Sequence, residues 1–234
     1  RTRRPLARAG AVCLVWTAGI AAVQADLFTP SVTVGSVVPD GNASGLVSVI
    51  DLAITAGPIR DVNVSLNLEG ARDGGWNGDL YVLLAHGSHS VVLLNRPGRA
   101  SANPFGYGDN GFDITLDDDA TGDAHLYGAL LSPSDSISPV GGTWQPDGRF
   151  VDPAVVLDTS PRTRLLSGFN GLDPAGEWRL FVADLSLGGV VKLASWSLQI
   201  ETDAVVVPES ARTGAVAGLA LLVGGALMLR RRLG

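Results

Sequence analysis

The chain has 234 residues, a formal net charge of −6, 46% hydrophobic residues and a single cysteine. Residues 1–25 carry four arginines, and residues 204–234 carry four arginines and one glutamate, so the segment between them has 9 basic and 22 acidic residues and a net charge of −13. This negative field repels phosphate backbones and excludes a nucleic-acid partner, and one cysteine excludes a disulfide framework.

The N-terminus has the pattern of a secretory signal peptide. The basic stretch "RTRRPLAR" precedes the apolar run "AGAVCLVWTAGIAAV", and small residues end at Ala25, just before Asp26. We therefore expect export and cleavage between Ala25 and Asp26, which removes residues 1–25 together with Cys13. A permanent membrane anchor is the alternative interpretation of this run.

Residues 26–203 show the two-residue periodicity of β-strands. In "RDVNVSLNL" the apolar residues at 62, 64, 66 and 68 alternate with polar ones, which buries one face of a strand. Further strands are predicted at 79–85, 89–95, 112–116, 177–185 and 192–200, and the first two of these form a hairpin around "HGS". Because the strands are short and the turns frequent, we predict one all-β domain, a β-sandwich.

Five motifs in this segment resemble, in order, the P domain (or Homo B domain) that accompanies subtilisin-like proprotein convertases. They are "VIDLAIT" with "DVNVSLNL", "GDLYVLLAHGSHSVVLLNRPG", "FDITLDDDA", "GGTWQPDGR" and "FNGLDPAGEWRLFVADLSLGGVVKLASWSLQI". The resemblance spans about residues 45–201 and implies a jelly-roll-like β-sandwich. The chain departs from the family at "GGWNGDL", where a His-Thr pair is common, and in the last hairpin, which lacks an acidic residue before its glycine.

The C-terminus predicts a membrane segment. After the linker 204–212, residues 213–229 form an uncharged apolar run of 17 residues. As a helix this run is about 25 Å long, near the lower limit for crossing a bilayer. Arg230, Arg231 and Arg232 in the end segment 230–234 follow it directly, and arginines in this place indicate a cytoplasmic end. We therefore expect a single transmembrane helix at 213–229 rather than a buried helix.

The linker resembles the beginning of the PEP-CTERM sorting signal of Gram-negative bacteria that produce extracellular polysaccharide. Val207, Pro208 and Glu209 match the signal, and Ser210 stands where a second proline is usual. The resemblance implies an exosortase as partner, cleavage near the motif, and release to the cell surface or extracellular matrix. Simple anchoring in the inner membrane is the alternative.

The sequence contains no catalytic motif. Neither a G-x-S-x-G nucleophile turn nor an H-E-x-x-H zinc motif is present, and a subtilisin-type triad requires a different scaffold. His86 and His89 flank the predicted hairpin turn, where we expect solvated residues rather than a zinc pair. We therefore expect a protein that is not an enzyme.

Five aspartates are candidate ligands for Ca²⁺, which prefers carboxylate and carbonyl oxygens on loops. Asp117, Asp118 and Asp119 are adjacent in "DDDATGD", while Asp79 and Asp184 lie in two of the motifs that carry the P-domain resemblance. The spacing is not that of an EF-hand, because position 12 of such a loop would be a glycine. Two interpretations stay open, a calcium site and solvated acidic turns.

Four tryptophans remain after removal of the signal peptide. Trp178 and Trp196 occupy inward positions of predicted strands, so we expect them in the core. Trp76 and Trp144 are expected on loops, where an aromatic ring beside Asp and Asn can stack on a sugar. Packing within the loops is the alternative use.

Three functions agree with these features. The first is a noncatalytic surface or matrix protein whose sandwich mediates adhesion. The second is a carbohydrate-binding module of the extracellular polysaccharide matrix. The third is an accessory domain for a separately encoded subtilisin-like peptidase.

Overall fold

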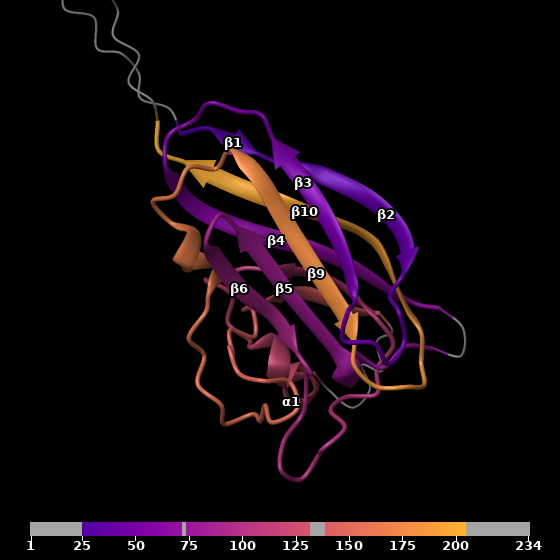
Figure 1. The fold of residues 1–234 in the computed structure, drawn as a ribbon. Coiled ribbons are helices and arrows are strands. Elements are labelled where there is room, and N and C mark those ends of the chain that lie inside the picture. The colour runs from indigo at the N-terminus through magenta and orange to yellow at the C-terminus, as the bar shows by residue number, and fades with distance from the viewer. Residues whose placement is uncertain (1–24, 72–73, 132–138, 205–234) are drawn as a thin grey trace, which may run out of the picture. The chain divides into compact units, whose positions relative to one another are not determined.

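Two β-sheets lie face to face in the described part of the chain (Figure 1). The computed structural model describes residues 25–71, 74–131 and 139–204, and residues 24–205 cluster into one compact unit. The prediction of an all-β sandwich is confirmed. The predicted signal-peptide run, the motif Val207–Ser210, the helix 213–229 and Arg230–Arg232 lie outside the described residues.

The described residues form ten strands and four short helical turns. The strands are β1 (Leu27–Phe28), β2 (Ser31–Val37), β3 (Leu46–Leu52), β4 (Ile59–Gly70), β5 (Leu80–His86), β6 (His89–Asn95), β7 (Phe112–Leu116), β8 (Val140–Trp144), β9 (Gly176–Asp184) and β10 (Val191–Thr202). The helical turns are η1 (Asn77–Asp79), η2 (Ala124–Leu126), α1 (Tyr127–Leu130) and η3 (Leu166–Phe169). Within the described ranges no helix is long and apolar enough to cross a membrane.

The strands divide between a six-stranded and a four-stranded sheet. The first sheet has the order β1-β10-β4-β7-β8, with β2 also paired to β10, and the second has the order β3-β9-β5-β6. Neighbouring strands are antiparallel except for β7 and β8, which are parallel. The predicted hairpin of β5 and β6 is confirmed, with His86 opposite His89. Figure 1 is viewed through the four-stranded sheet, with β10 and β4 behind it.

The core lies between the inner faces of the two sheets. The alternating apolar residues of β4 are all buried, as the sequence predicts, and they face the inward residues of β9 and β5. Trp178 and Trp196 are buried, which confirms their predicted place in the core. The Trp196 indole Nε1 donates a hydrogen bond to the Ser48 hydroxyl at 2.9 Å, so β10 and β3 are joined across the sandwich. Inward apolar and outward polar residues therefore fix the register of each strand.

The long connection between β7 and β9 contains little regular structure, and buried charged side chains hold it in place. The His125 ring Nδ1 lies 2.8 Å from the Asp147 carboxylate, and Arg149 forms ion pairs with both Asp147 and Asp123. Asp147 also accepts a hydrogen bond from the backbone N–H of Asn95 at the end of β6. The irregular segment is thereby attached to the edge of the four-stranded sheet.

His125 makes stability depend on pH. Burial lowers the pKa of His125, but hydrogen bonds to Asp147 and to the Arg99 carbonyl, with the charge of Asp147, outweigh it, so the pKa lies above the usual 6.5. A raised pKa means that this stabilisation is complete below pH 6.5 and is lost as pH rises through the folded-state value.

We therefore expect the free energy of unfolding to fall as the pH rises above 6.5, and to fall less in His125→Gln. Urea unfolding at each pH measures the slope. His89→Gln, which changes an exposed histidine, is the control and should keep the wild-type slope. Equal slopes in wild type and His125→Gln would contradict the expectation.

Candidate binding cleft

An open cleft of about 470 Å³ lies beside the start of β5 and the turn between β9 and β10. Its apolar wall consists of Trp76, Phe105, Tyr107 and Leu187, and Asp79 and Ser186 line its polar side. Trp76 is 47% exposed, Phe105 78% and Leu187 80%. Three aromatic rings around one cleft with fixed polar groups are the usual composition of a small-molecule site. We call this feature the Trp76 cleft.

Glycine at position 78 allows the walls of the cleft to meet. A Cβ atom on Gly78 would overlap the carbonyl oxygen of Phe105 and lie 2.8 Å from the backbone of Gly106. The Gly78 N–H donates to the Tyr107 carbonyl at 2.8 Å, which fixes this close approach. The loop that carries Phe105 and Tyr107 is therefore seated directly on η1.

The tryptophan and tyrosine rings are supported from behind. A Cβ atom on Gly188 would overlap the six-membered ring of Trp76, so the ring rests on the backbone of the β9–β10 turn. Tyr107 packs on Tyr127 with ring centroids 4.6 Å apart. Both rings are thus held by neighbouring groups while they line the cleft, so little side-chain entropy is left for a ligand to remove.

Arg96 joins the segments beneath the cleft. Its guanidinium donates to the Gly78 carbonyl at 2.9 Å, to the Asp79 carboxylate at 3.1 Å and to the Ser186 hydroxyl at 3.2 Å. Among the described residues other than glycine, only Arg96 has a positive φ, at 51°. Such a conformation costs about 1–3 kcal/mol and persists where surrounding contacts hold it. The end of β6, the start of β5 and the β9–β10 turn are therefore fixed relative to one another.

Asp184 lies next to this cluster and is fully buried. Neither of its carboxylate oxygens has a hydrogen-bond partner of good geometry. Burial, followed by the charge of Asp79, raises the pKa of Asp184 to about 7, although the nearby Ser186 N–H offsets part of this rise. A buried carboxylate without a partner is costly unless a proton or a cation neutralises it.

The five predicted calcium ligands do not converge. Asp79 and Asp184 lie together at one end of the sandwich. Asp117 directly follows the C-terminal end of β7. Asn77, in the same turn as Asp79, accepts a hydrogen bond from the N–H of Gly111, which directly precedes the N-terminal end of β7. A five-residue strand is about 16 Å long, so the two groups lie at opposite ends of it. In the described ranges no three His, Cys, Asp or Glu side chains are placed to hold one metal ion.

The acidic run 117–119 acts mainly on the backbone. Asp118 accepts hydrogen bonds from the N–H groups of Leu166 and Ser167, at 3.0 and 2.8 Å, and so caps η3. Asp117 accepts from the Asp119 N–H at 2.8 Å, which closes a turn. Asp119 is exposed. This arrangement corresponds to the acidic-turn interpretation more closely than to a cation site.

Trp76 and Trp144 differ in their places. Trp76 lies on a loop, as predicted, with its ring at the cleft. The predicted loop position of Trp144 is wrong, because Trp144 ends strand β8 and is only 9% exposed. Its indole Nε1 donates to the Gly141 carbonyl, and its ring packs near Tyr127. The parallel pairing of β8 with β7 draws this ring inward, so it offers almost no surface to a ligand.

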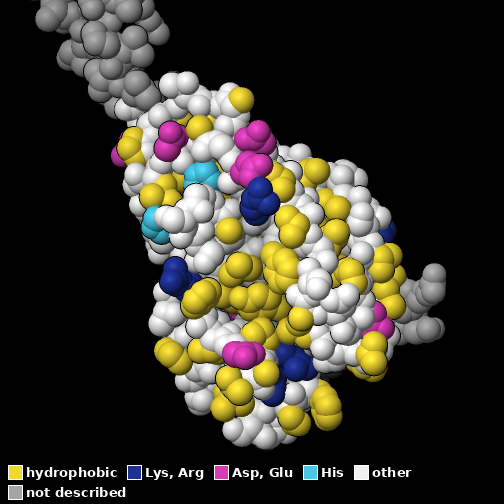
Figure 2. Space-filling view, viewed as in Figure 1, with side chains coloured by type: hydrophobic (Ala, Val, Ile, Leu, Met, Phe, Trp, Pro, Cys, Tyr) yellow, Lys and Arg dark blue, Asp and Glu magenta, His cyan; other side chains and the backbone are white. Residues whose placement is uncertain are grey.

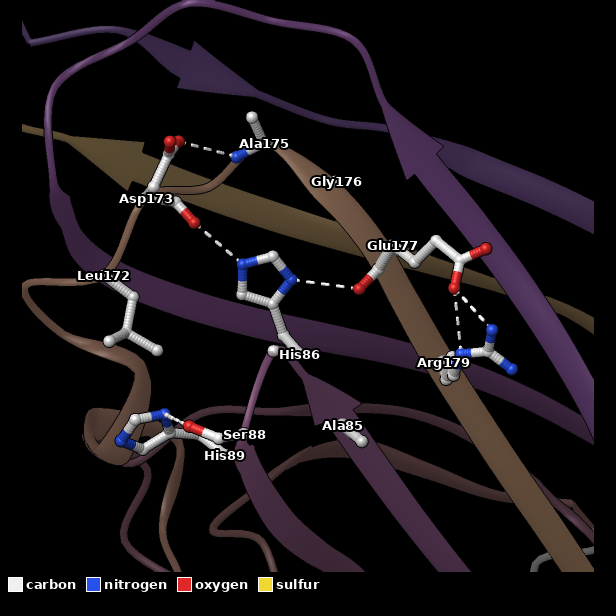
Figure 3. A pocket seen from close by; sticks show the side chains of 11 residues that line it. Ala85, His86, Ser88, His89, Leu172, Asp173, Ala175, Gly176, Glu177 and Arg179 are labelled. Atoms are coloured by element: carbon white, nitrogen blue, oxygen red, sulfur yellow. Dashed lines mark hydrogen bonds and ion pairs between the residues drawn. The ribbon is translucent and has the colours of Figure 1, made fainter.

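A second cleft, of about 610 Å³, lies at the tip of the β5–β6 hairpin (Figure 3). The two ring nitrogens of His86 lie 3.0 and 2.7 Å from the carbonyl oxygens of Glu177 and Asp173, and its ring stacks on Trp178 at 4.1 Å. The expectation of a solvated His86 is therefore wrong, while His89 is exposed. Because both His86 nitrogens face backbone oxygens, this histidine joins the segment before β9 to the hairpin.

The nitrogens of His125 are committed in the same way. Nδ1 bonds Asp147, and Nε2 lies 3.0 Å from the Arg99 carbonyl oxygen. Within the described residues, one serine hydroxyl bonds a histidine ring. The Ser88 oxygen lies 3.4 Å from Nδ1 of its exposed neighbour His89. A nucleophile and its base usually lie within about 2.6–3.2 Å of each other, and a third group orients the base.

The outer face of the four-stranded sheet is partly apolar. Val47 and Val49 on β3 are exposed, and Phe181 on β9 contacts Tyr81 on β5 edge to face at 6.2 Å. Figure 2 shows hydrophobic side chains gathered over this sheet and around the loops below it. Exposed apolar residues are common on antiparallel sheets that have only one face toward the core.

Comparison with known proteins gives no assignment by sequence. No family model matches the chain, and no curated protein matches it. A solved structure, the complex of the Aeromonas sobria serine protease (ASP) with its chaperone (ORF2), aligns with a TM-score of 0.44 and 16% sequence identity. The alignment covers 78% of this chain and 28% of that chain. This degree of likeness is too low to transfer a role.

The contact at Gly78 yields a testable expectation. Gly78→Ala places a methyl group against the Phe105 carbonyl, and overpacking of this kind costs about 1–3 kcal/mol. We expect a loss of that size in the free energy of unfolding, together with a red shift of tryptophan fluorescence as the Trp76 cleft opens.

Gly108→Ala is the matched control, since a Cβ atom there meets nothing within 4 Å. It lies on the same loop and should change neither quantity. Equal stability of the two variants would show that the loop does not need the close approach.

Proposed function

We propose that this chain is a noncatalytic exported protein of the P-domain type, whose jelly-roll-like sandwich mediates adhesion or matrix interaction through the Trp76 cleft. The observation that carries the proposal is the cleft itself, with aromatic rings supported from behind and open in front. The commitment of the His86 and His125 nitrogens to structural contacts favours binding over catalysis. The motif order from about residue 45 to 201 favours the P-domain relation.

Localisation to the cell surface or extracellular matrix of a Gram-negative bacterium completes the proposal. The signal-peptide pattern ending at Ala25 supports export, and Val207-Pro208-Glu209 with the apolar run and arginines supports sorting by an exosortase. Proline suits a cleavage motif because it keeps the residue before it extended and ends the following helix outside the bilayer. The membrane segment then serves as a temporary anchor.

Calcium is part of the proposal in a narrower form. Asp184 has two buried oxygens without partners, and Asp79 is the carboxylate beside it, so these two residues fit a cation, with backbone oxygens and water completing its shell. Asp118 fits poorly, because its oxygens cap η3. A cation at Asp184 would neutralise a buried charge and stabilise the floor of the Trp76 cleft.

An accessory role beside a separately encoded subtilisin-like peptidase is the alternative proposal, and it rests on the motif resemblance. Co-purification of a peptidase with the exported protein, and loss of that peptidase's stability without it, would favour this role. Retention in matrix without any peptidase would favour the adhesive role.

The proposal predicts a processed product in the matrix. In a host with an active exosortase, the released protein should begin at Asp26 and end near residue 210, as measured by intact mass. Glu209→Ala should remain full length in the membrane fraction. If wild type and variant both remain full length in the membrane, the tail is only an anchor. If the wild type never leaves the cytoplasm, the proposed function is wrong.

Calcium should raise the melting temperature of the 25–204 domain at pH 8. A ligand that binds only the folded state stabilises it by about 2.7 kcal/mol at a hundredfold excess over its Kd. Asp184→Asn should melt higher than wild type in chelator, because it removes a buried charge, and should not respond to calcium. Asp118→Ala, which removes the η3 cap, should melt lower but keep the response. Equal midpoints with calcium and chelator in wild type would eliminate the site.

A further inference from the structure

The structure points to a ligand class for the Trp76 cleft, and this inference rests on the proposed binding function. We propose that the cleft binds a neutral saccharide, with one pyranose ring stacked on Trp76 and its hydroxyl groups bonded to Ser186 and Asp79. The chemistry of the lining, its charge and its rigidity each favour this ligand.

The lining matches a ligand with an apolar face and a polar rim. Trp76, Phe105 and Leu187 expose large apolar surfaces, while Ser186 and the 4% exposed Asp79 add polar groups to the lining of the cleft. A pyranose ring has this division, because its axial C–H groups form apolar faces and its hydroxyls project from the edge. A purely apolar ligand would leave the hydrogen of the Ser186 hydroxyl without an acceptor, which is costly.

The polar side offers a donor and an acceptor next to each other. Arg96 donates to both the Ser186 hydroxyl and the Asp79 carboxylate, so it fixes their positions. Since the Ser186 oxygen accepts from Arg96, its own hydrogen is left to donate. Adjacent sugar hydroxyls, each both donor and acceptor, can bond such a pair at once.

Charge selects a neutral saccharide over an acidic one. Asp79 borders the cleft, Asp184 lies beneath it, and the cation there, Arg96, is already paired with Asp79. The segment 26–203 carries a net charge of −13. Uronate or phosphate groups would be repelled by these negative charges, whereas neutral hydroxyl groups would not be.

The size and rigidity of the cleft fit a short stretch of polysaccharide. About 470 Å³ lies within the range of pockets that bind small molecules, and Trp76, Phe105 and Leu187 in its lining are exposed. The Trp76 ring rests on Gly188 and Tyr107 rests on Tyr127, so the stacking surfaces are formed before binding.

Direct titration tests the proposal. The 25–204 domain, which contains every described strand and the whole core, is titrated calorimetrically with neutral hexasaccharides of glucose, mannose, galactose and N-acetylglucosamine. Oligogalacturonate is the acidic comparison, and tetramethylammonium tests the cleft as an aromatic cage for cations. Because the other described tryptophans are buried, a change in tryptophan fluorescence on binding reports Trp76.

We expect at least one neutral hexasaccharide to bind, with Trp76→Ala weakening binding more than tenfold and Trp76→Phe weakening it less. Ser186→Ala should weaken binding several-fold. Phe150→Ala is the matched control, because Phe150 is also 47% exposed and does not line the cleft. It should bind as the wild type does.

Three outcomes would overturn the inference. They are no binding of any neutral hexasaccharide, binding that Trp76→Ala leaves unchanged, and preferential binding of tetramethylammonium or oligogalacturonate. Matrix retention of the processed protein despite any of these outcomes would leave the proposed adhesive function standing with a different ligand. Loss of export or matrix retention would instead count against the function itself.

Discussion

The arrangement of one end of the sandwich depends on the guanidinium of Arg96. It donates hydrogen bonds to Gly78 and Asp79 in η1, directly before β5, and to Ser186 in the β9–β10 turn. The backbone N–H of Arg96 donates to the Leu80 carbonyl at 2.8 Å. Removing one partner of a buried ion pair typically costs about 3–5 kcal/mol, because the other charge is left unpaired. The strained backbone of Arg96 is affordable only because these contacts compensate for it.

A different set of charges performs the same task along the irregular connection before β9. His125, Asp147 and Arg149 are buried and bond each other and the edge of the four-stranded sheet. Both sets replace the regular hydrogen bonds that loops lack. A protein without disulfides in its described part can therefore position long loops by buried ion pairs, at the cost of sensitivity to pH.

Strand positions were predictable, while the cleft was only partly so. Period-two alternation located β4, β5, β7, β9 and β10, whereas β6 was located as a short apolar run after the turn and is buried on both faces. Strands β1, β2, β3 and β8 were not among the predicted ranges. For β8, the two glycines of its "VGGTW" segment obscure the alternation, and its pairing with β7 is parallel. Trp144 was therefore placed on a loop, although it lies in the core.

The cleft residues show why single motifs were insufficient. Trp76 stood out because it is an aromatic residue among polar ones, but Phe105, Tyr107 and Leu187 come from segments about 30 and 110 positions away. The glycine-rich "PFGYGDNG" was a usable signal, since glycines beside aromatic residues permit a close approach. Arg96 could not have been found, because its role depends on a positive φ and on three partners that are distant in the sequence.

Leaving the cleft open has an energetic cost that bears on its purpose. A tryptophan side chain buries about 150–250 Å² when covered, and apolar area contributes about 25 cal/mol per Å². With 47% of Trp76 exposed, roughly 2 kcal/mol of hydrophobic stabilisation is unrealised, and Phe105 and Leu187 add to it. The free energy of unfolding of a protein is only about 5–15 kcal/mol in total, so the stabilisation lost by keeping these side chains exposed is a substantial fraction of it. Collapse of the rings onto one another would recover that energy, and the contacts of Trp76 with Gly188 and of Tyr107 with Tyr127 oppose it. Such resistance to collapse is expected of a site that gains the same energy when a ligand covers the rings.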